Sequence, residues 1–281
     1  MNETQEKNLR RFASQMRRWI IEGVYRAQSG HPGGSLSATD IIAYLYQEEL
    51  SVDPKAPRNP NRDRFVLSKG HCAPALYAAL GLRGFFDIQE MKNLRQFGSF
   101  LQGHPCMSTV PGVDMSTGSL GQGISAAVGM ALAAKLDGKD YRVYCVMGDG
   151  ELQEGEVWEA FMCAAHYHLD NLCVIIDHNG LQIDGATTDV MNLGSVNDKM
   201  TAFGWHSIPT DGHDFASLEK GFAEAKQQKG MPSVLVAKTV KGKGVSFMEN
   251  QASWHGSAPK EEQYNVAVVE LDALISKSEE L

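Results

Sequence analysis

The stretch VMGDGELQEGEVWEAFMCAAHYHLDNLCVIIDHNGLQIDG, residues 146–185, decides the fold of this chain. Residues 141–147 and 171–177 are apolar runs rich in β-branched side chains, and each ends at a small polar cluster, GDGE and DHNG. Between the two runs, apolar residues recur at helical spacing over the length of one helix. These patterns predict a strand, a helix and a second strand.

The two predicted strands place Asp149 and Asn179 together. A right-handed crossover makes the strands parallel, so both residues leave the sheet at the same carboxyl edge, where open α/β sheets bind ligands. Mg²⁺ takes oxygen ligands and is usually held by one or two carboxylates and the phosphates of a ligand. Gly148 and Gly150 let the backbone approach a phosphate, and a helix begins just after them. The residues therefore predict a metal-bridged diphosphate site. The alternative is an ordinary turn in which Asp and Asn are turn formers.

Four of the nine histidines lie on loops shaped by glycine or proline next to a predicted helix or strand end. These candidates for binding and proton transfer are His31, His71, His104 and His255. His178 lies between the two predicted metal ligands and is expected to point away from them. The remaining histidines lack glycine support, and we expect them to be structural.

The spaced motifs resemble those of transketolase. They are GDGELQEG and DHNGLQIDG, which resemble the thiamine-diphosphate motif, together with SGHPGG, RFVLSKGH, GHP and TGSLGQGISAAVGMA. The match runs from about residue 29 to residue 259. It covers the amino-terminal, diphosphate-binding half of that family's usual chain. The fold that this implies is a thiamine-diphosphate-binding domain of the PP type.

The resemblance implies a role for each candidate residue. The metal, Mg²⁺, would be held by Asp149, Asn179 and the backbone oxygen of Leu181. The diphosphate of thiamine diphosphate would contact Gly150, His71 and His255, and its rings would lie against Gly118, Ser119 and Leu120. Many members of the family have proline where Ser119 stands. His31 and His255 would relay protons, and His104 would bind the hydroxyl of the transferred ketol unit.

Composition excludes several classes of protein. The net charge is −8 and the pI is about 5.6, whereas nucleic-acid and membrane-surface binding need clustered Lys and Arg. The five cysteines are scattered without a C-x-x-C pair, which favours a reducing compartment. We see no signal peptide and no apolar run of the roughly 18 residues that a membrane span needs. A cytoplasmic protein is predicted.

The rest of the chain continues the alternation of strands and helices. An amphipathic helix is predicted at the amino terminus, and another over residues 37–50 with Ser37 or Thr39 as its cap. Strands and helices then alternate, as in a doubly wound, mostly parallel sheet flanked by helices. We expect one domain over residues 1–281, ending in a short helical tail. The helix from residue 120 is rich in Ala and Gly, which suits either a subunit interface or close internal packing.

The resemblance also implies a partner. In transketolases, the carboxylate that activates the aminopyrimidine belongs to a pyrimidine-binding domain, which we expect to be absent from this chain. The prediction is a split enzyme, in which this chain forms a heterotetramer with a separately encoded carboxyl-terminal subunit and transfers a two-carbon ketol unit between sugars or sugar phosphates. The alternatives are another thiamine-diphosphate enzyme, such as deoxyxylulose-phosphate synthase or the α chain of a 2-oxo acid dehydrogenase, and a non-catalytic scaffold.

Overall fold

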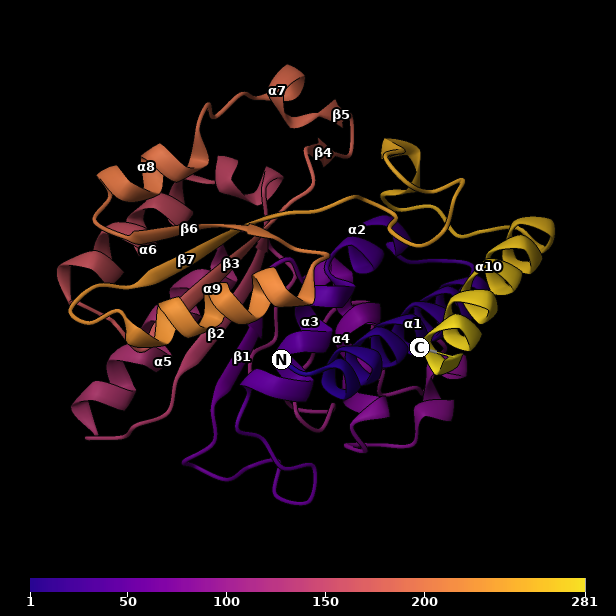
Figure 1. Cartoon of the computed structure of the whole chain (residues 1–281), viewed down its shortest axis with the longest axis horizontal. Coiled ribbons are helices and arrows are strands. Elements are labelled where there is room, and N and C mark those ends of the chain that lie inside the picture. Colours follow the sequence, from indigo (N-terminus) through magenta and orange to yellow (C-terminus); the bar gives the residue numbers. More distant parts are fainter. Residues whose placement is uncertain (281) are drawn as a thin grey trace.

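The computed structural model describes residues 1–280, and its centre is a five-stranded parallel sheet (Figure 1). The strands follow the order β1 (Arg64–Leu67), β2 (Val143–Gly148), β3 (Leu172–His178), β7 (Ser233–Lys238) and β6 (His206–Asp211), and each neighbouring pair is parallel. Gly148 at the end of β2 pairs with Asp177 near the end of β3. Asp149 and Asn179 therefore leave the sheet at one edge. The predicted parallel α/β fold is confirmed.

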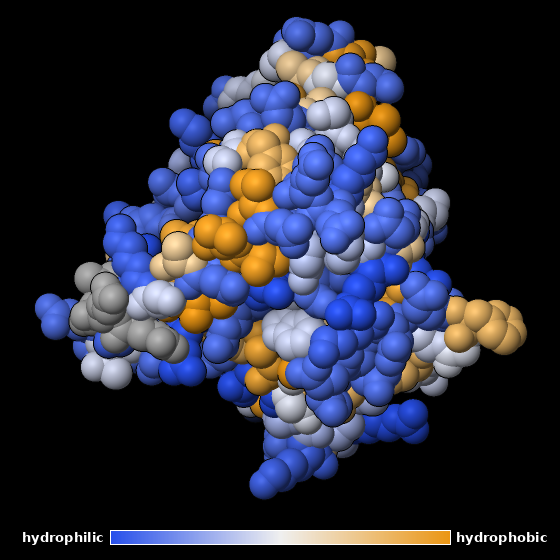
Figure 2. All heavy atoms as spheres, turned by 90° about the vertical axis from the view of Figure 1, so that its right-hand side faces the viewer, coloured by the Kyte–Doolittle hydropathy of each residue, from blue (hydrophilic) through white to orange (hydrophobic). Residues whose placement is uncertain are grey.

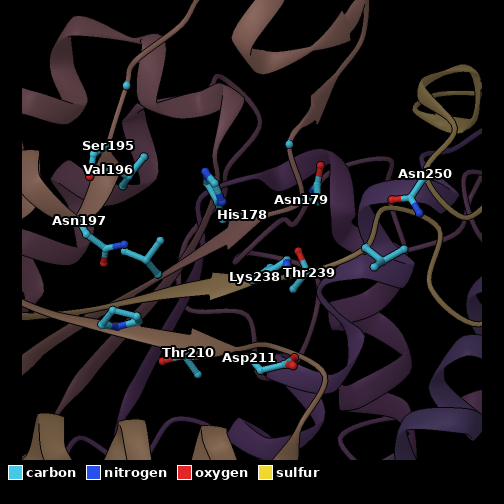
Figure 3. A pocket seen from close by; sticks show the side chains of 15 residues that line it. His178, Asn179, Ser195, Val196, Asn197, Thr210, Asp211, Lys238, Thr239 and Asn250 are labelled. Atoms are coloured by element: carbon cyan, nitrogen blue, oxygen red, sulfur yellow. The ribbon is translucent and has the colours of Figure 1, made fainter.

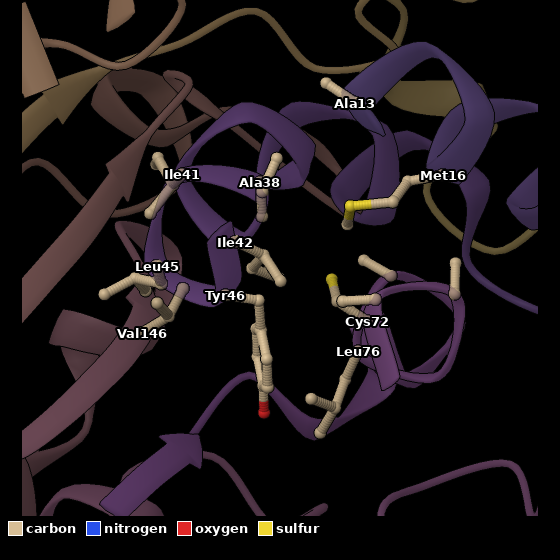
Figure 4. Packing of buried hydrophobic residues seen from close by; sticks show 14 of the residues in the cluster. Ala13, Met16, Ala38, Ile41, Ile42, Leu45, Tyr46, Cys72, Leu76 and Val146 are labelled. Carbon is tan, nitrogen blue, oxygen red and sulfur yellow. The ribbon is translucent and has the colours of Figure 1, made fainter. Parts of the chain in front are cut away.

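Helices cover both faces of the sheet because its strands are apolar on both sides. Tyr144 and Val146 of β2 belong to one buried cluster, whereas Val143, Cys145 and Met147 belong to the other. The first cluster includes residues of α1 (Glu3–Ala27), α3 (Thr39–Tyr44), α4 (Ala73–Leu82) and α9 (Phe215–Gln227). Figure 4 shows how Ile42, Tyr46, Leu76 and their neighbours fill it. The second cluster includes residues of α5 (Gln122–Leu136), α6 (Gly155–His166) and α8 (Val196–Ala202).

The helix α5 packs internally along one face, as one of the two alternatives for its composition predicts. Ile124, Ala127 and Ala131 are buried in the second cluster, so one face of the helix packs internally. On the other face a side chain at Gly129 would meet nothing within 4 Å, and Leu136 is 85% exposed. The outer face is thus exposed at these two positions within residues 1–280, and a subunit interface there stays a prediction.

The two terminal helices pack against each other. The ring of Tyr25 in α1 stacks on that of Tyr264 in α10 (Glu261–Glu280) with 4.0 Å between their centroids. Figure 2 looks onto the side that carries α10, where hydrophobic groups gather in a band among hydrophilic ones; the exposed apolar residues of α10 include Val266, Val269 and Leu274. Among the described residues, no helix has the length and apolar character needed to cross a membrane.

Three local predictions were wrong or incomplete. The SGHPGG segment is not simply a loop: Pro32–Ser37 forms the short helix α2, because proline suits the first position of a helix. Ser37 and Thr39 are not caps, since His31 stands at the N-cap position of α2 and Ala38 at that of α3. The predicted helix over residues 37–50 is α3 followed by a π-helical turn, Leu45–Glu49.

Several short elements were not predicted. Four of them separate β3 from β6: the hairpin of β4 (Leu181–Gln182) and β5 (Gly185–Ala186), the helix α7 (Thr187–Val190), and α8. Short 3₁₀ turns also occur at Gly70–Cys72, Gly150–Gln153 and Ala252–Trp254, whereas the short helix expected from residue 88 is present as the 3₁₀ helix Ile88–Asn93. The turns at Gly70–Cys72 and Gly150–Gln153 directly follow the sheet edge and shape the site described next.

Candidate functional site

A cavity of about 390 Å³ lies at the carboxyl edge of the sheet and gathers most of the predicted site residues. Those that line it are His31, His71, Gly118, Leu120, Asp149, Gly150, Asn179, Leu181 and His255. They come from separate parts of the chain, so the fold brings them together. Ser119 lies between two lining residues but is not part of the wall. His104 also stands outside the wall; its ring lies behind Gly118, where an added Cβ would be 3.3 Å from its Cδ2.

Asp149 and Asn179 are held by backbone groups. The carboxylate of Asp149 accepts hydrogen bonds from the N–H of Gly150 at 2.9 Å and from the N–H of Gly180 at 2.6 Å. The side-chain oxygen of Asn179 accepts from the N–H of Leu181 at 3.1 Å. The Asp149 carboxylate is buried, and burial followed by the nearby Asp177 charge raises its pKa. Within residues 1–280 this carboxylate is held by N–H groups and not by a salt bridge, so a bound cation would relieve its charge.

Three histidine rings meet at one side of the cavity. The ring centroids of His31 and His71 are 5.1 Å apart, those of His71 and His255 are 5.1 Å apart, and those of His31 and His255 are 5.4 Å apart. Gly33 lets the segment before His255 approach the segment after His31, because a Cβ added at Gly33 would lie 2.8 Å from the backbone oxygen of Trp254. The loop that carries His255 therefore lies directly against the helix that follows His31.

All three rings are neutral at physiological pH. Burial, followed by the charge of Arg95, lowers the pKa of His31 to about 4. Burial, followed by the charge of Lys241, lowers the pKa of His255 to about 3, and burial and Lys69 hold the pKa of His71 well below its usual value. A neutral imidazole offers one donor and one acceptor nitrogen, so each ring can take up or pass a proton.

Sequence reasoning missed two lysines at the site. Lys241 lines the cavity, and its ammonium lies 3.2 Å from the backbone oxygen of Leu181 and 2.8 Å from Nδ1 of His255. Burial, followed by the charge of Lys69, lowers the pKa of Lys241 to about 8. Lys69 also lines the cavity. Both lysines lie in glycine-containing segments that the sequence already singled out for their histidines, and this was the signal that could have found them.

Lys69 forms a buried ion pair with Asp177. Its ammonium contacts the Asp177 carboxylate, which also accepts from the hydroxyl of Ser37 at 2.5 Å and from the hydroxyl of Thr239. Burial alone would raise the pKa of Asp177, but the Lys69 charge and the hydrogen bonds outweigh it and lower that pKa. The amide of Asn179 donates to the same carboxylate at 3.4 Å. The ion pair of Lys69 and Asp177 therefore helps to orient the side-chain amide of Asn179.

Glu151 connects three segments around the cavity. One carboxylate oxygen accepts from the hydroxyl of Ser68 at 2.5 Å and from the N–H of Gly121 at 2.9 Å, and the other accepts from the N–H of Gly148 at 3.1 Å. Burial raises the pKa of Glu151. This carboxylate fixes the loops after β1 and β2 and the start of α5 relative to one another.

A second, larger cavity of about 830 Å³ opens between the ends of β3, β6 and β7 and the start of α8 (Figure 3). Its lining contains amides and hydroxyls such as Asn197, Thr210 and Thr239. His178 lines this cavity and not the first one. Of the predicted site residues, only Asn179 contributes to its wall. Because most of the predicted site residues line the smaller cavity, we take that cavity as the candidate site.

Comparison with known proteins identifies the family. Residues 9–271 match the family described as transketolase, thiamine diphosphate binding domain. The chain belongs to this family. The predicted resemblance to transketolase is thus confirmed, and so is the expectation of a thiamine-diphosphate-binding domain.

Two similar proteins have nearly the same length as this chain. It is 46% identical over 263 residues to a subunit of apulose-4-phosphate transketolase from Phocaeicola vulgatus, covering 94% of this chain and 93% of that protein. It is 44% identical over 268 residues to 6-deoxy-6-sulfo-D-fructose transketolase subunit SqwG of a Clostridium species, covering 95% and 98%. The solved transketolase of Campylobacter jejuni matches with a TM-score of 0.85 and 33% identity, covering 100% of this chain and 48% of that chain. The chain therefore spans about half of that longer transketolase.

Proposed function

We propose that this chain is the thiamine-diphosphate-binding subunit of a split transketolase. The enzyme transfers a two-carbon ketol unit from a ketose phosphate to an aldose phosphate, and it is active only with a separately encoded carboxyl-terminal subunit. The observation that carries this proposal is one cavity that combines Asp149 and Asn179 with three neutral histidine rings. The near full-length similarity to two proteins named as transketolase subunits supports it.

The residues present fit a metal and a diphosphate. Asp149 offers a carboxylate, Asn179 an amide oxygen and Leu181 a backbone oxygen, which are the donors that Mg²⁺ prefers. Lys241 brings a positive charge to the same wall, and Gly150 leaves room for close approach. We assign the metal to Asp149, Asn179 and Leu181, and the diphosphate to Gly150, His71 and His255. The cofactor rings would lie against residues 118–120, of which Gly118 and Leu120 line the cavity.

In this proposal, histidines accept and donate protons and bind a substrate hydroxyl. When bound, thiamine diphosphate supplies the carbon nucleophile and the electron sink for the carbon–carbon bond chemistry. His31 and His255 are neutral and lie side by side, so each can accept or donate a proton at the carbonyl and hydroxyl oxygens of the donor sugar. His104, next to Gly118, binds the hydroxyl of the ketol unit. Lys241 supplies a positive charge for an anionic ligand at a wall that also carries the carboxylate of Asp149.

The partner subunit would cover surface that this chain leaves exposed. Ile183 lines the cavity and is 67% exposed, and Met191 beyond it is 58% exposed. Leu136 of α5 and Met162 of α6 are also exposed apolar residues. Large apolar residues that lie exposed beside a binding cavity are candidates for contact with a partner. We propose a heterotetramer in which the partner supplies the pyrimidine-binding domain, and we expect a cytoplasmic location.

Reconstitution tests this function. The chain and its partner would be mixed with thiamine diphosphate, Mg²⁺ and a panel of ketose and aldose phosphates, with ¹³C in the first two carbons of the donor. We expect the labelled two-carbon unit to appear in the acceptor. Consumption of pyruvate without ketol transfer would instead indicate one of the other thiamine-diphosphate enzymes. Full activity of the complex after His31→Ala would favour a scaffold role.

A further inference from the structure

Arg95 connects two segments that carry predicted catalytic histidines. Its guanidinium donates through Nη1 to the hydroxyl of Ser29 at 3.0 Å and through Nη2 to the backbone oxygen of Gly103 at 3.1 Å. Its own backbone N–H donates to the backbone oxygen of Leu101 at 2.9 Å. Arg95 has a φ of +58°, which is rare for a residue with a side chain, so the surrounding contacts must hold the backbone there.

The guanidinium lies closely against the backbone of Gly103. A Cβ added at Gly103 would be 2.8 Å from Cζ of Arg95 and 2.9 Å from its Nε. Any side chain at this position would therefore displace the guanidinium. Nε is buried and has no hydrogen-bond partner among the described residues. Arginine provides a rigid, planar set of donors that can reach both segments at once, and lysine has only one nitrogen.

Each of the two segments leads directly into a histidine. Ser29 comes two residues before His31, and Gly103 comes just before His104. These histidines belong to different parts of the site, since His31 packs on His71 and His255, whereas His104 lies behind Gly118. Arg95 thus hydrogen-bonds to both segments through one side chain.

We propose that Arg95 is a positioning residue that joins the Ser29 and Gly103 segments and so sets His31 and His104 relative to each other for ketol transfer. This inference rests on the proposed function for its catalytic consequence only. The joint itself, which is the pair of hydrogen bonds from Arg95 to Ser29 and Gly103, is present in the described chain whatever reaction the enzyme catalyses. Beyond the roles of the histidines themselves, Arg95 would hold the segments that carry His31 and His104 in a fixed relative position.

The charge of Arg95 has a second effect on the same two residues. After burial, it is the largest influence that lowers the pKa of His31, followed by His104 and Lys241. After burial, it also lowers the pKa of His104. The other groups that face His31 are the rings of His71 and His255, whose pKa values are lowered too. Arg95 therefore favours the neutral form of both histidines.

Two variants of Arg95 separate geometry from charge. Arg95→Lys keeps the charge but cannot bridge the two segments, and Arg95→Met removes both. In the assembled complex we expect kcat to fall by roughly 10- to 100-fold in both variants, because small displacements of catalytic groups are costly. We expect the affinity for thiamine diphosphate to be unchanged. Ser29→Ala removes one of the two side-chain contacts and should give a smaller fall in kcat.

The matched control is Arg83→Lys. Arg83 also has a buried Nε with no partner among the described residues, but it lies at the end of α4, away from the cavity lining. This variant should keep the kcat of the wild type. If Arg95→Lys and Arg95→Met also keep kcat within about twofold of wild type, the positioning role is wrong.

A measurement on the chain itself keeps the inference separate from the proposed function. The pKa values of His31 and His104 would be measured by NMR in the full chain without substrate. Arg95→Met should raise both, and Arg95→Lys should raise them less, whereas Arg83→Lys should leave them unchanged. If both pKa values are unchanged in Arg95→Met, the inference is overturned even when the complex transfers ketol units. If the complex transfers none but Arg95→Lys, which keeps the charge and breaks the bridge, still raises both pKa values, the proposed function fails and the joint stands.

Discussion

The rings of His31 and His255 stand edge to face, with 5.4 Å between their centroids, although they come from opposite ends of the chain. Neither ring is charged at physiological pH, because burial lowers both pKa values. This pairing places two proton-accepting groups at one side of the candidate cofactor cavity. It is the feature from which the proposed transfer of protons follows.

Replacing either histidine should therefore remove proton transfer without removing the fold. For His31→Ala and for His255→Ala in the assembled complex, we expect kcat to fall by about 100-fold or more. His31→Ala should leave the affinity for thiamine diphosphate close to wild type, since His31 is not assigned to the diphosphate. Steady-state kinetics and calorimetry measure the two effects. Unchanged kcat in both variants would contradict the proposed roles.

Lys241 should contribute to cofactor binding through its charge. Lys241→Met removes an ammonium from the cavity wall, and a hydrogen bond to a charged group contributes about 1.5–3 kcal/mol. We expect the Kd for thiamine diphosphate to rise by about 10- to 100-fold, as measured by calorimetry of the complex. Lys238→Met is the control, because Lys238 lines the second cavity. Equal affinities in the two variants would show that Lys241 is not at the cofactor.

The ion pair of Lys69 and Asp177 should matter for stability. Lys69→Met leaves the Asp177 carboxylate buried without its cation, and breaking a buried pair in this way costs about 3–5 kcal/mol of unfolding free energy. Lys135→Met breaks the more exposed pair with Asp170 and should cost about 1 kcal/mol or less. Denaturation with urea measures both changes. Similar losses in the two variants would argue against a special role for the buried pair.

The neutral histidines make stability depend on pH. The pKa of His31 falls from 6.5 to about 4 on folding, so between these values the unfolded chain binds more protons than the folded one. The contribution of His31 is therefore complete above pH 6.5 and is lost as the pH falls toward 4. His31→Gln should make the unfolding free energy less dependent on pH in this range. If the unfolding free energy depended on pH in the same way in the variant and in the wild type, folding would not lower the pKa of His31.

The sequence predicted the sheet and the convergence of Asp149 and Asn179 because both follow from local patterns. Two apolar runs with a helical segment between them leave little choice of fold, and the right-handed crossover then determines which edge the polar residues share. The histidines at positions 31, 71 and 255 were found because glycine and proline mark their loops. None of these steps needed a contact between distant residues.

The remaining features depend on such contacts. Nothing near Lys69 in the sequence predicts that its partner is Asp177, and nothing near Arg95 predicts Ser29 and Gly103 as its acceptors. The short helix α2 was missed for a different reason, because the glycines around Pro32 outweighed its preference for the first helical position. The elements between residues 181 and 202 are too short for a periodic pattern to be recognised.

The binding of thiamine diphosphate to the assembled complex tests the central claim most directly. Calorimetry would compare wild type with Asp149→Asn, at saturating Mg²⁺ and without Mg²⁺. We expect tight binding by wild type that requires Mg²⁺, and little or no binding by Asp149→Asn under either condition. Equal, metal-independent binding by the two proteins would contradict the assignment of this cavity as a metal–diphosphate site.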